Sequence, residues 1–297
     1  MERTQESLDS LKWYRRIAWG PSITLVVLPV CGIVAAFWVR LYAPTAIFTL
    51  AYGYIVLLSV TAGYHRLWSH GSYVASIPLK IFLAVIGAAA LQGPIRWWAC
   101  GHRAHHRFTD TSEDPYNIKK GFFHAHILWM LLKQPKRNRR VEISDLLKDP
   151  VVAWQARYYI PLAVGMGWLF PMAVAGLCWN DWSGGFLYGG ILRMFVCHQG
   201  VFCINSVCHF FGDQPYDDKF SPRNIPHLLA MCTLGEGYHN YHHAFPADYR
   251  LGVHWYDLDA TKWNIWLWGK LGLARNLKRC RQTKVDKASL RQMQKGQ

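Results

Sequence analysis

The sequence predicts an all-α integral membrane protein, in which four transmembrane helices lie beneath a cytosolic helical cap that holds a two-metal site. Three observations predict this fold. Four apolar runs are each about as long as a bilayer-spanning helix. Basic residues are concentrated in the segments outside those runs, and nine of the 14 histidines fall in four short clusters. We expect residues 1–297 to form one domain.

The composition favours a membrane part and a water-facing part within the same chain. Hydrophobic residues make up 52% of the sequence, which excludes a disordered polymer. The mean hydropathy of +0.01 is nevertheless low for a protein made only of spanning helices. The formal net charge of +15 suits anionic lipid headgroups, acidic proteins or phosphorylated substrates. Nucleic acid is disfavoured as a partner, because the basic residues flank apolar segments and no recognised nucleic-acid module is present.

The four apolar runs give the predicted spans and their connections. The spans cover about residues 17–39, 44–63, 159–179 and 184–208. Short turns join the first span to the second and the third to the fourth, so each pair should form a hairpin. The first sixteen residues are too long and too acidic for the leader of a cleaved signal peptide, so we expect the first run to remain as an anchor. The fourth run contains Arg193, His198, Asn205 and Ser206, and polar residues at membrane depth are candidates for function.

The distribution of Lys and Arg predicts the orientation of the chain. Thirteen lie between residues 65 and 156, thirteen lie from residue 209 onward, and four lie in the N-terminal segment, whereas the two short turns contain only Arg40. The positive-inside tendency therefore places both termini and the cap, residues 65–156 and 209–274, in the cytosol. Within the cap, residues 81–91 and 121–132 suit helices in the interface plane. Residues 275–297 form a basic tail, which we expect to be surface-bound or disordered.

The eight cysteines indicate packing rather than chemistry. They are scattered along the chain, several inside apolar runs, and no Cys-x-x-Cys pair is present. We expect them to be buried and reduced.

The histidine clusters carry the chemical signal. They are HRLWSH at residues 65–70, HRAHH at 102–106, NSVCH at 205–209 and HNYHH at 239–243. On an α-helix, residues at i, i+3 and i+4 share a face, so each H-x-x-H-H triad can converge on one point or on two adjacent points. His65 and His70 would diverge by about 140° on an α-helix, so we expect the second span to end and unwind there.

Nine clustered imidazoles are the pattern expected for a metal site. Neutral imidazole is the commonest protein metal ligand, and without metal the rings would repel one another when protonated. Soluble di-iron carboxylate proteins pair two Glu-x-x-His motifs, but this chain has only the one from Glu236 to His239. A catalytic zinc site needs three protein ligands, so redox iron with oxygen fits nine histidines better. The isolated histidines are expected to pack or to form hydrogen bonds; they are His124, His126, His198, His227 and His254.

Longer motifs around these histidines resemble the membrane acyl-CoA Δ9 desaturases of animals and fungi, the stearoyl-CoA desaturase family. The similarity extends from about Trp19 to Gly269. Its most specific segments are HRLWSH at 65–70, HRAHHRFTDTSEDPYN at 102–117, NSVCHFFG at 205–212 and GEGYHNYHHAFPADYR at 235–250. Short histidine motifs alone would also admit membrane hydroxylases.

The resemblance implies a set of ligands and a binding tunnel. It implies two iron ions, with O2 as co-substrate, and Asn205 near one iron through a water. The implied iron ligands are His65, His70, His102, His105, His106, His209, His239, His242 and His243. It also implies a kinked acyl tunnel with Gln92, Trp98 and Val201 at the bend, Trp129 and Lys133 near the coenzyme A headgroup, and a closed end near Thr49 and Gly53. The implied product is a cis double bond in a saturated fatty acyl-CoA.

The resemblance further implies the partners and the compartment. The chain lacks the His-Pro-Gly-Gly element of a fused cytochrome b5 domain, so electrons are expected from a separate cytochrome b5 and its NADH-dependent reductase. The expected location is the endoplasmic reticulum membrane. Animal members have Arg-Asp where this chain has Cys100 and Gly101, which weakens the inference to a coenzyme A headgroup.

Two other functions stay open at this point. One is a membrane hydroxylase, or a desaturase acting on another lipid acyl chain or a sphingoid base. The other is a non-catalytic metal or haem carrier. Carboxylates close to the histidines in sequence are candidates to orient the imidazole rings, since ligating histidines usually donate their other N–H. These candidates are Asp110, Asp114, Asp213 and Glu236.

Overall fold

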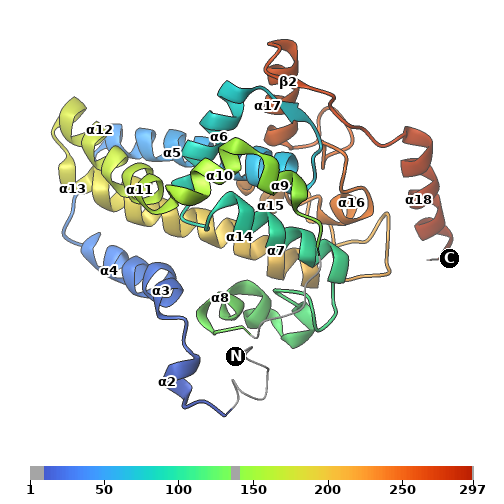
Figure 1. The fold of residues 1–297 in the computed structure, drawn as a ribbon, viewed down its shortest axis with the longest axis horizontal. Coiled ribbons are helices and arrows are strands. Elements are labelled where there is room, and N and C mark those ends of the chain that lie inside the picture. The colour runs from blue at the N-terminus through green and yellow to red at the C-terminus, as the bar shows by residue number, and fades with distance from the viewer. Residues whose placement is uncertain (1–9, 135–140, 296–297) are drawn as a thin grey trace.

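The computed structural model describes residues 10–134 and 141–295, and these are mostly helical (Figure 1). The prediction about the first sixteen residues includes residues 1–9, which lie outside the described residues. The last two residues of the basic tail, 296 and 297, also lie outside them. The two strands found in the described part, β1 (Val74–Ala75) and β2 (Ala274–Arg275), pair antiparallel with Val74 opposite Arg275.

Within the described residues, three helices are long and apolar enough to cross a membrane: Ala43–Ser69, Tyr159–Trp179 and Trp182–Phe210. They agree with the second, third and fourth predicted spans. Each combines α-helical and wider π-helical segments. The segments are α5 (Ala43–Leu58) with η2 (Ser59–Ser69), then α11 (Tyr159–Val164), η5 (Gly165–Leu169) and α12 (Phe170–Trp179), and finally α13 (Trp182–Gly184), η6 (Gly185–Leu192) and α14 (Arg193–Phe210).

The predicted first span is shorter in the structure. The helix extends only from Trp19 to Ala35, through α3 (Trp19–Ser22), η1 (Ile23–Val27) and α4 (Leu28–Ala35). At its start, Ile17 is extended and forms a β-bridge with Leu132. At its end, the backbone turns at Phe37, whose N–H bonds to the Val34 carbonyl at 3.2 Å. Phe37 and the neighbouring Trp38 are exposed, as aromatic residues at a membrane surface often are.

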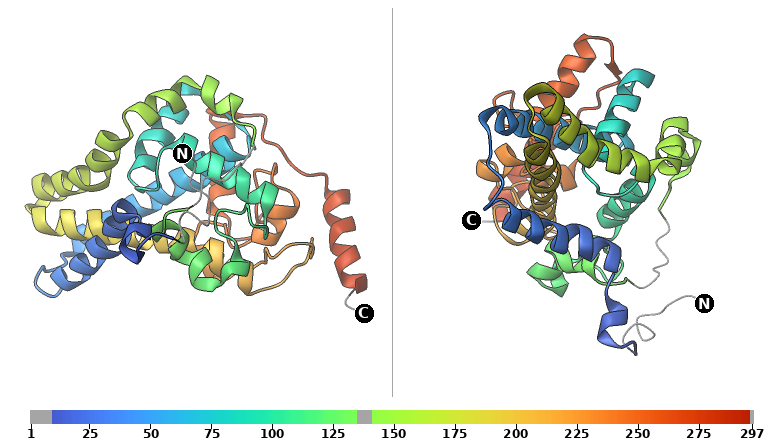
Figure 2. Two further views of the ribbon diagram at one scale, coloured as in Figure 1. Left: turned by 60° about the horizontal axis from the view of Figure 1, so that its bottom comes forward. Right: turned by 90° about the vertical axis from the view of Figure 1, so that its left-hand side faces the viewer.

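The remaining helices surround one end of the spans (Figure 2). They are α2 (Trp13–Arg16), α6 (Ile77–Ala88), α7 (Ile95–Phe108), the 3₁₀ turn η3 (Ile118–Lys120), η4 (His124–Leu128), α8 (Trp129–Leu131), α9 (Ser144–Lys148), α10 (Pro150–Arg157), α15 (Leu228–Cys232), α16 (His239–Ala244), α17 (Ala260–Lys270) and α18 (Gln282–Lys295). Much of the basic tail is therefore an ordered helix, α18, in which Val285 is buried and Lys295 pairs with Asp218 at 2.7 Å.

The main core lies where η2, α6, α7 and α10 meet, directly beneath the histidine clusters. Its most deeply buried members include Val56, Ala62, Leu83, Ile95 and Val152. Gln155 of α10 joins the layers, because its side chain accepts from the N–H of Ile95 at 3.1 Å and donates to the Tyr64 hydroxyl at 2.8 Å. Because both the oxygen and the nitrogen of this buried amide are hydrogen-bonded, Gln155 fixes the start of α7 against η2.

Close packing of the third and fourth spans depends on Gly185. A Cβ at this position would lie 2.6 Å from the Pro171 carbonyl oxygen and 2.6 Å from the Ala175 Cβ. At Gly190, five residues further along the same helix, the nearest atom to an added Cβ would be 3.4 Å away, in the Trp168 side chain. The two glycines therefore differ in the space around them while sharing the same helical context.

We predict that Gly185→Ala lowers the thermal unfolding midpoint of the purified protein by several degrees. The added methyl would press on backbone, and overpacking costs about 1–3 kcal/mol. The matched control, Gly190→Ala, gains the same helix propensity without the close contact, so its midpoint should stay at or slightly above that of the wild type. Equal midpoints for the two variants in a detergent thermal-shift assay would show that these spans do not pack as described.

Candidate metal centre

All nine clustered histidines meet in two adjacent groups. The first group contains His65, His70, His102, His106 and His242. The second group contains His105, His209, His239 and His243. Within each group, one ring nitrogen from every histidine lies within 4.8 Å of the others. Either group could hold a metal ion.

Four elements supply these side chains: η2 with its C-cap residue His70, α7, the end of α14, and α16. The sequence left open whether each H-x-x-H-H triad serves one point or two, and the structure divides both triads between the groups. In α7, His102 and His106 lie one turn apart and face the first group, while His105 faces the second. In α16, His239 and His243 face the second group and His242 the first. The two short helices therefore bridge the two groups.

The prediction that the second span ends at His65 and His70 is confirmed, since the helix ends at Ser69, but the prediction that it unwinds there is wrong. The helix instead widens into the π-helical segment η2, and the N–H of His70 bonds to the carbonyl of His65 at 3.2 Å. An i→i+5 hydrogen bond brings residues five apart onto one face, whereas an α-helix would separate them. The two ring centroids are consequently 5.0 Å apart. Spacing read as α-helical could not reveal this arrangement.

The inward-facing atoms are the Nε2 nitrogens, and their separations suit a shared cation. In the first group, His65 and His106 each approach His242 at 2.9 Å, and His70 approaches His102 at 2.9 Å. In the second group, His239 lies 3.0 Å from His209 and 3.1 Å from His243. Two nitrogens bound at right angles to one ion, at roughly 2.0–2.1 Å each, would be about 2.9 Å apart. The donor set and its spacing therefore fit a metal ion in each group.

Hydrogen bonds from the opposite ring nitrogen to a carboxylate fix the tautomer of two histidines. The Nδ1 of His65 bonds to Glu236 at 2.7 Å, and the Nδ1 of His105 bonds to Asp114 at 2.9 Å. A carboxylate only accepts, so each Nδ1 carries the proton and each Nε2 presents a lone pair. This is the tautomer that a metal ligand requires.

His209 reaches its carboxylate through a serine. Its Nδ1 lies 2.7 Å from the Ser221 hydroxyl, which donates to Asp110 at 2.6 Å. Asp110 therefore orients His209 only through the Ser221 hydroxyl. The position of Asp110 close to histidines in the sequence could not indicate the role of Ser221. The fourth candidate, Asp213, is exposed and pairs through its backbone with Asn224. Among the described residues, its side chain has no hydrogen bond to a histidine.

Burial favours the uncharged form of three of the clustered histidines outside the spans. It lowers the pKa of His102, His106 and His242 well below the ordinary value, and the neighbouring imidazoles lower it further. Burial alone would raise the pKa of Asp114, but the adjacent His105 holds that pKa below its usual range. The site therefore combines neutral donors with ionised carboxylates behind them.

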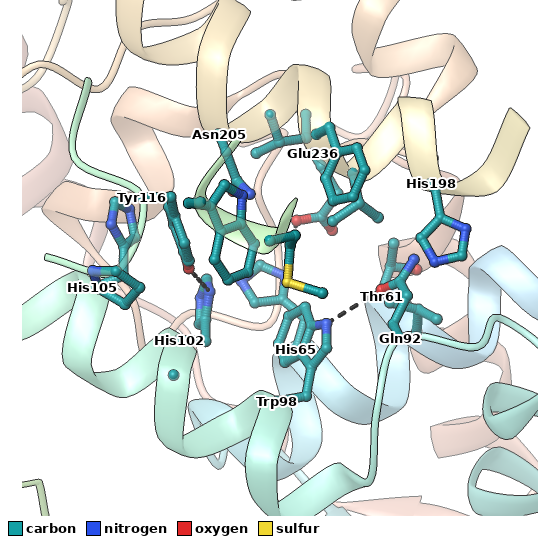
Figure 3. A pocket seen from close by; sticks show the side chains of 18 of the residues that line it. Thr61, His65, Gln92, Trp98, His102, His105, Tyr116, His198, Asn205 and Glu236 are labelled. Atoms are coloured by element: carbon teal, nitrogen blue, oxygen red, sulfur yellow. Dashed lines mark hydrogen bonds and ion pairs between the residues drawn. The ribbon is translucent and has the colours of Figure 1, made fainter. Parts of the chain in front are cut away.

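An apolar pocket opens onto both histidine groups (Figure 3). Its wall includes His65 and His102 of the first group and His105 and His239 of the second. Five of the residues predicted to contact substrate or metal also line it, namely Gln92, Trp98, Trp129, Val201 and Asn205. Lys133, Thr49 and Gly53 are not among its lining residues. Thr49 and Gly53 instead lie beside Gly189 and Arg193 of the fourth span, and Lys133 bonds through its N–H to the Arg16 carbonyl at 2.8 Å.

Aromatic side chains join the pocket wall to the histidines. Trp98 donates to Gln92 at 3.1 Å and stacks on His102, with ring centroids 5.1 Å apart. Tyr116 packs on His105 at 4.4 Å and on Trp129 at 5.0 Å. Sequence reasoning missed Tyr116, although its place in the motif after the second histidine cluster was a signal. Gly101 also lines the pocket, and a Cβ there would have no atom within 4 Å, so the wall is open at the altered Cys100-Gly101 pair.

Two of the isolated histidines form ordinary hydrogen bonds, in agreement with the prediction. His126 lies between Ser206 at 2.9 Å and Gln199 at 3.0 Å. The Nδ1 of His198 lies 2.9 Å from the Met194 carbonyl.

Comparison with known proteins identifies the family. Residues 40–275 match the family model described as "Fatty acid desaturase". The chain is 46% identical to "Probable acyl-CoA desaturase" of Schizosaccharomyces pombe and 41% identical to "Acyl-CoA desaturase 1" of Saccharomyces cerevisiae, over 95% of this chain in both cases. It is 40% identical to "Stearoyl-CoA desaturase 5" of Homo sapiens over 78% of this chain and 72% of the human protein.

The chain belongs to the fatty acid desaturase family. It spans 59% and 56% of the lengths of the two fungal relatives. Together with its three candidate spans, membership of this family indicates a membrane protein. The paired histidine groups of this chain are compatible with a metal site.

We predict that Asp114→Asn weakens metal retention by about 10–100-fold, because the carboxylate that orients His105 is lost while the side-chain volume is kept. The measurement is metal content by mass spectrometry after timed exposure to a chelator. Asp213→Asn is the matched control and should behave as wild type. If both variants retain metal equally, Asp114 does not support a ligand.

Proposed function

We propose that this chain is an oxygen-dependent desaturase that introduces a cis double bond at position Δ9 of a saturated fatty acyl-CoA. The nine grouped histidines would hold two iron ions, with Asn205 near one of them through a water. The single observation that carries the proposal is the apolar pocket whose wall contains histidines of both groups. A metal carrier would have no use for an apolar pocket wall at its metal site.

The donor chemistry supports iron. Imidazole is a ligand that iron accepts readily, and five plus four histidines exceed the set that a catalytic zinc needs. Iron bound there would supply, from O2 and two electrons, the oxidising power to remove hydrogen from two adjacent methylenes. The protein's own task is then to hold one pair of methylenes beside the histidines and to exclude water from the reacting carbons.

Residues of the pocket can perform that positioning. The hydrogen bond between Trp98 and Gln92 fixes a rigid wall next to His102. Val201 faces the same space from α14 and offers an apolar surface without a hydrogen-bonding group. An acyl chain seated there would be fixed by shape, so the site of desaturation would depend on the distance from the headgroup to the histidines. We place the headgroup near Trp129 and Lys133 and the chain end near Thr49 and Gly53, so the substrate would extend beyond the pocket at both ends, since Lys133, Thr49 and Gly53 do not line it.

The setting of the reaction completes the proposal. We place the chain in the endoplasmic reticulum membrane with four spans, both termini in the cytosol and the histidine-bearing cap on the cytosolic side. Electrons would come from cytochrome b5 and its NADH-dependent reductase. The net charge of +15 supports an acidic electron donor, because opposite charge steers association. The names of the relatives, acyl-CoA and stearoyl-CoA desaturases, support the substrate class.

Expression in yeast that lacks its own Δ9 desaturase tests the function. Gas chromatography of total fatty acids, with the double bond located by mass spectrometry, should reveal Δ9-monounsaturated chains. Hydroxylated chains instead would indicate a membrane hydroxylase. If the protein is present and loaded with iron but makes no unsaturated product, the proposed activity is wrong.

Variants in the two histidine groups test the ligand assignment. His105→Ala removes a donor from the second group and His242→Ala removes one from the first. Each should abolish the product while the protein still inserts into the membrane. His254→Ala, in an exposed loop outside both groups, should retain full activity. Normal activity in either of the first two variants would refute the assignment.

A further inference from the structure

Helix α17 carries an exposed apolar stripe that its position in the predicted water-facing cap does not explain. Trp263, Trp266 and Leu267 in the helix and its C-cap residue Leu271 follow one another at helical spacing and are all exposed, with Trp266 48% and Leu271 63% accessible. The opposite face buries Thr261 and Ile265 against the core. Large apolar side chains gathered along one helix face usually mark a contact with a partner or with lipid.

The stripe adjoins the surface of the second span. The Asn264 amide donates to the Tyr54 hydroxyl at 2.8 Å, and the hydroxyl of Thr261 lies 2.8 Å from that of Thr61. Tyr54 and the neighbouring Ile55 are exposed on α5, within the helix that is long enough to cross the bilayer. The exposed face of α17 is therefore close to a surface that faces lipid.

The composition of this region suits the headgroup boundary of a bilayer. Lys270 lies over the Trp266 ring at 5.6 Å, so a cation and an aromatic ring are paired at the end of the stripe. The loop before α17 adds Trp255, which is 83% exposed, and Tyr256. Trp and Tyr are enriched at membrane–water interfaces, and Lys on an amphipathic helix binds anionic lipid.

We propose that α17 is an interfacial helix whose Trp263, Trp266, Leu267 and Leu271 insert into the cytosolic leaflet. The proposal requires only that the chain is a membrane protein with its cap on the cytosolic side, so it stands whatever lipid is the substrate. In Figure 1, α17 and α8 lie at opposite edges of the molecule. Residues 121–132, which include α8, were predicted to be interfacial, so lipid would hold the cap from both sides.

Hydrogen bonds connect α17 to the segment that carries part of the first histidine group. The helix is capped by Asp259, whose carboxylate accepts from the N–H of Lys262 at 2.9 Å. The same carboxylate binds the buried guanidinium of Arg66 at 2.9 and 3.1 Å. Arg66 follows His65 in η2, so the lipid-bound helix would be fixed directly to the scaffold of the first histidine group.

Photo-crosslinking in nanodiscs tests the proposal. Trp266→p-benzoylphenylalanine, in nanodiscs of phosphatidylcholine and phosphatidylglycerol, should give a covalent lipid adduct by intact-protein mass spectrometry. The same substitution at Leu50, which is 75% exposed on α5, is the positive control. Lys287 on α18 is exposed and serves as the negative control.

Lipid adducts at positions 266 and 50, but not at 287, are the expected result. An adduct at 50 alone would overturn the proposal. A crosslink from 266 to a second protein chain would likewise overturn it, since the stripe would then be a protein contact. A second variant at Leu267, 47% exposed, covers the case in which the change at Trp266 prevents folding.

Discussion

The convergence of nine imidazoles on two points is the constraint on which the rest of this structure depends. Ring nitrogens 2.9 to 3.3 Å apart can share only one proton between them, so most of the facing lone pairs cannot be satisfied by one another. Burial makes protonation an expensive solution, as the lowered pKa of His102 and His242 indicates. A cation in each group satisfies every lone pair at once.

Buried charges behind the histidines hold this convergence in place. Arg66 bonds to Asp259 and Glu236, and Glu236 in turn bonds to His65. Removing one partner of such a network leaves an uncompensated buried charge, so the network specifies a single arrangement even where it adds little stability. Gly235 allows the close approach, since a Cβ there would lie 2.5 Å from the Asp259 carboxylate and its φ is 114°. These contacts connect Asp259 and Glu236 through Arg66 and hold His65 in the first group.

Much of this could be predicted from the sequence, because long apolar runs and clustered histidines are strong local signals. Three predicted spans agree with helices in the structure. All nine clustered histidines come together in two groups, as the four histidine motifs had indicated. Three features could not be predicted, because each depends on tertiary contacts or on a helix type that residue spacing does not encode. These are the π-helical turn that brings His65 and His70 together, the division of each triad between two groups, and the role of Ser221 between His209 and Asp110.

Absorption spectroscopy at the iron K-edge of the purified protein, combined with metal analysis, tests the central claim most directly. The account predicts two iron ions per chain, each surrounded mainly by nitrogen scatterers at roughly the 2.0–2.2 Å expected for histidine ligands. A single metal ion per chain, or a first shell dominated by oxygen or sulfur, would contradict it.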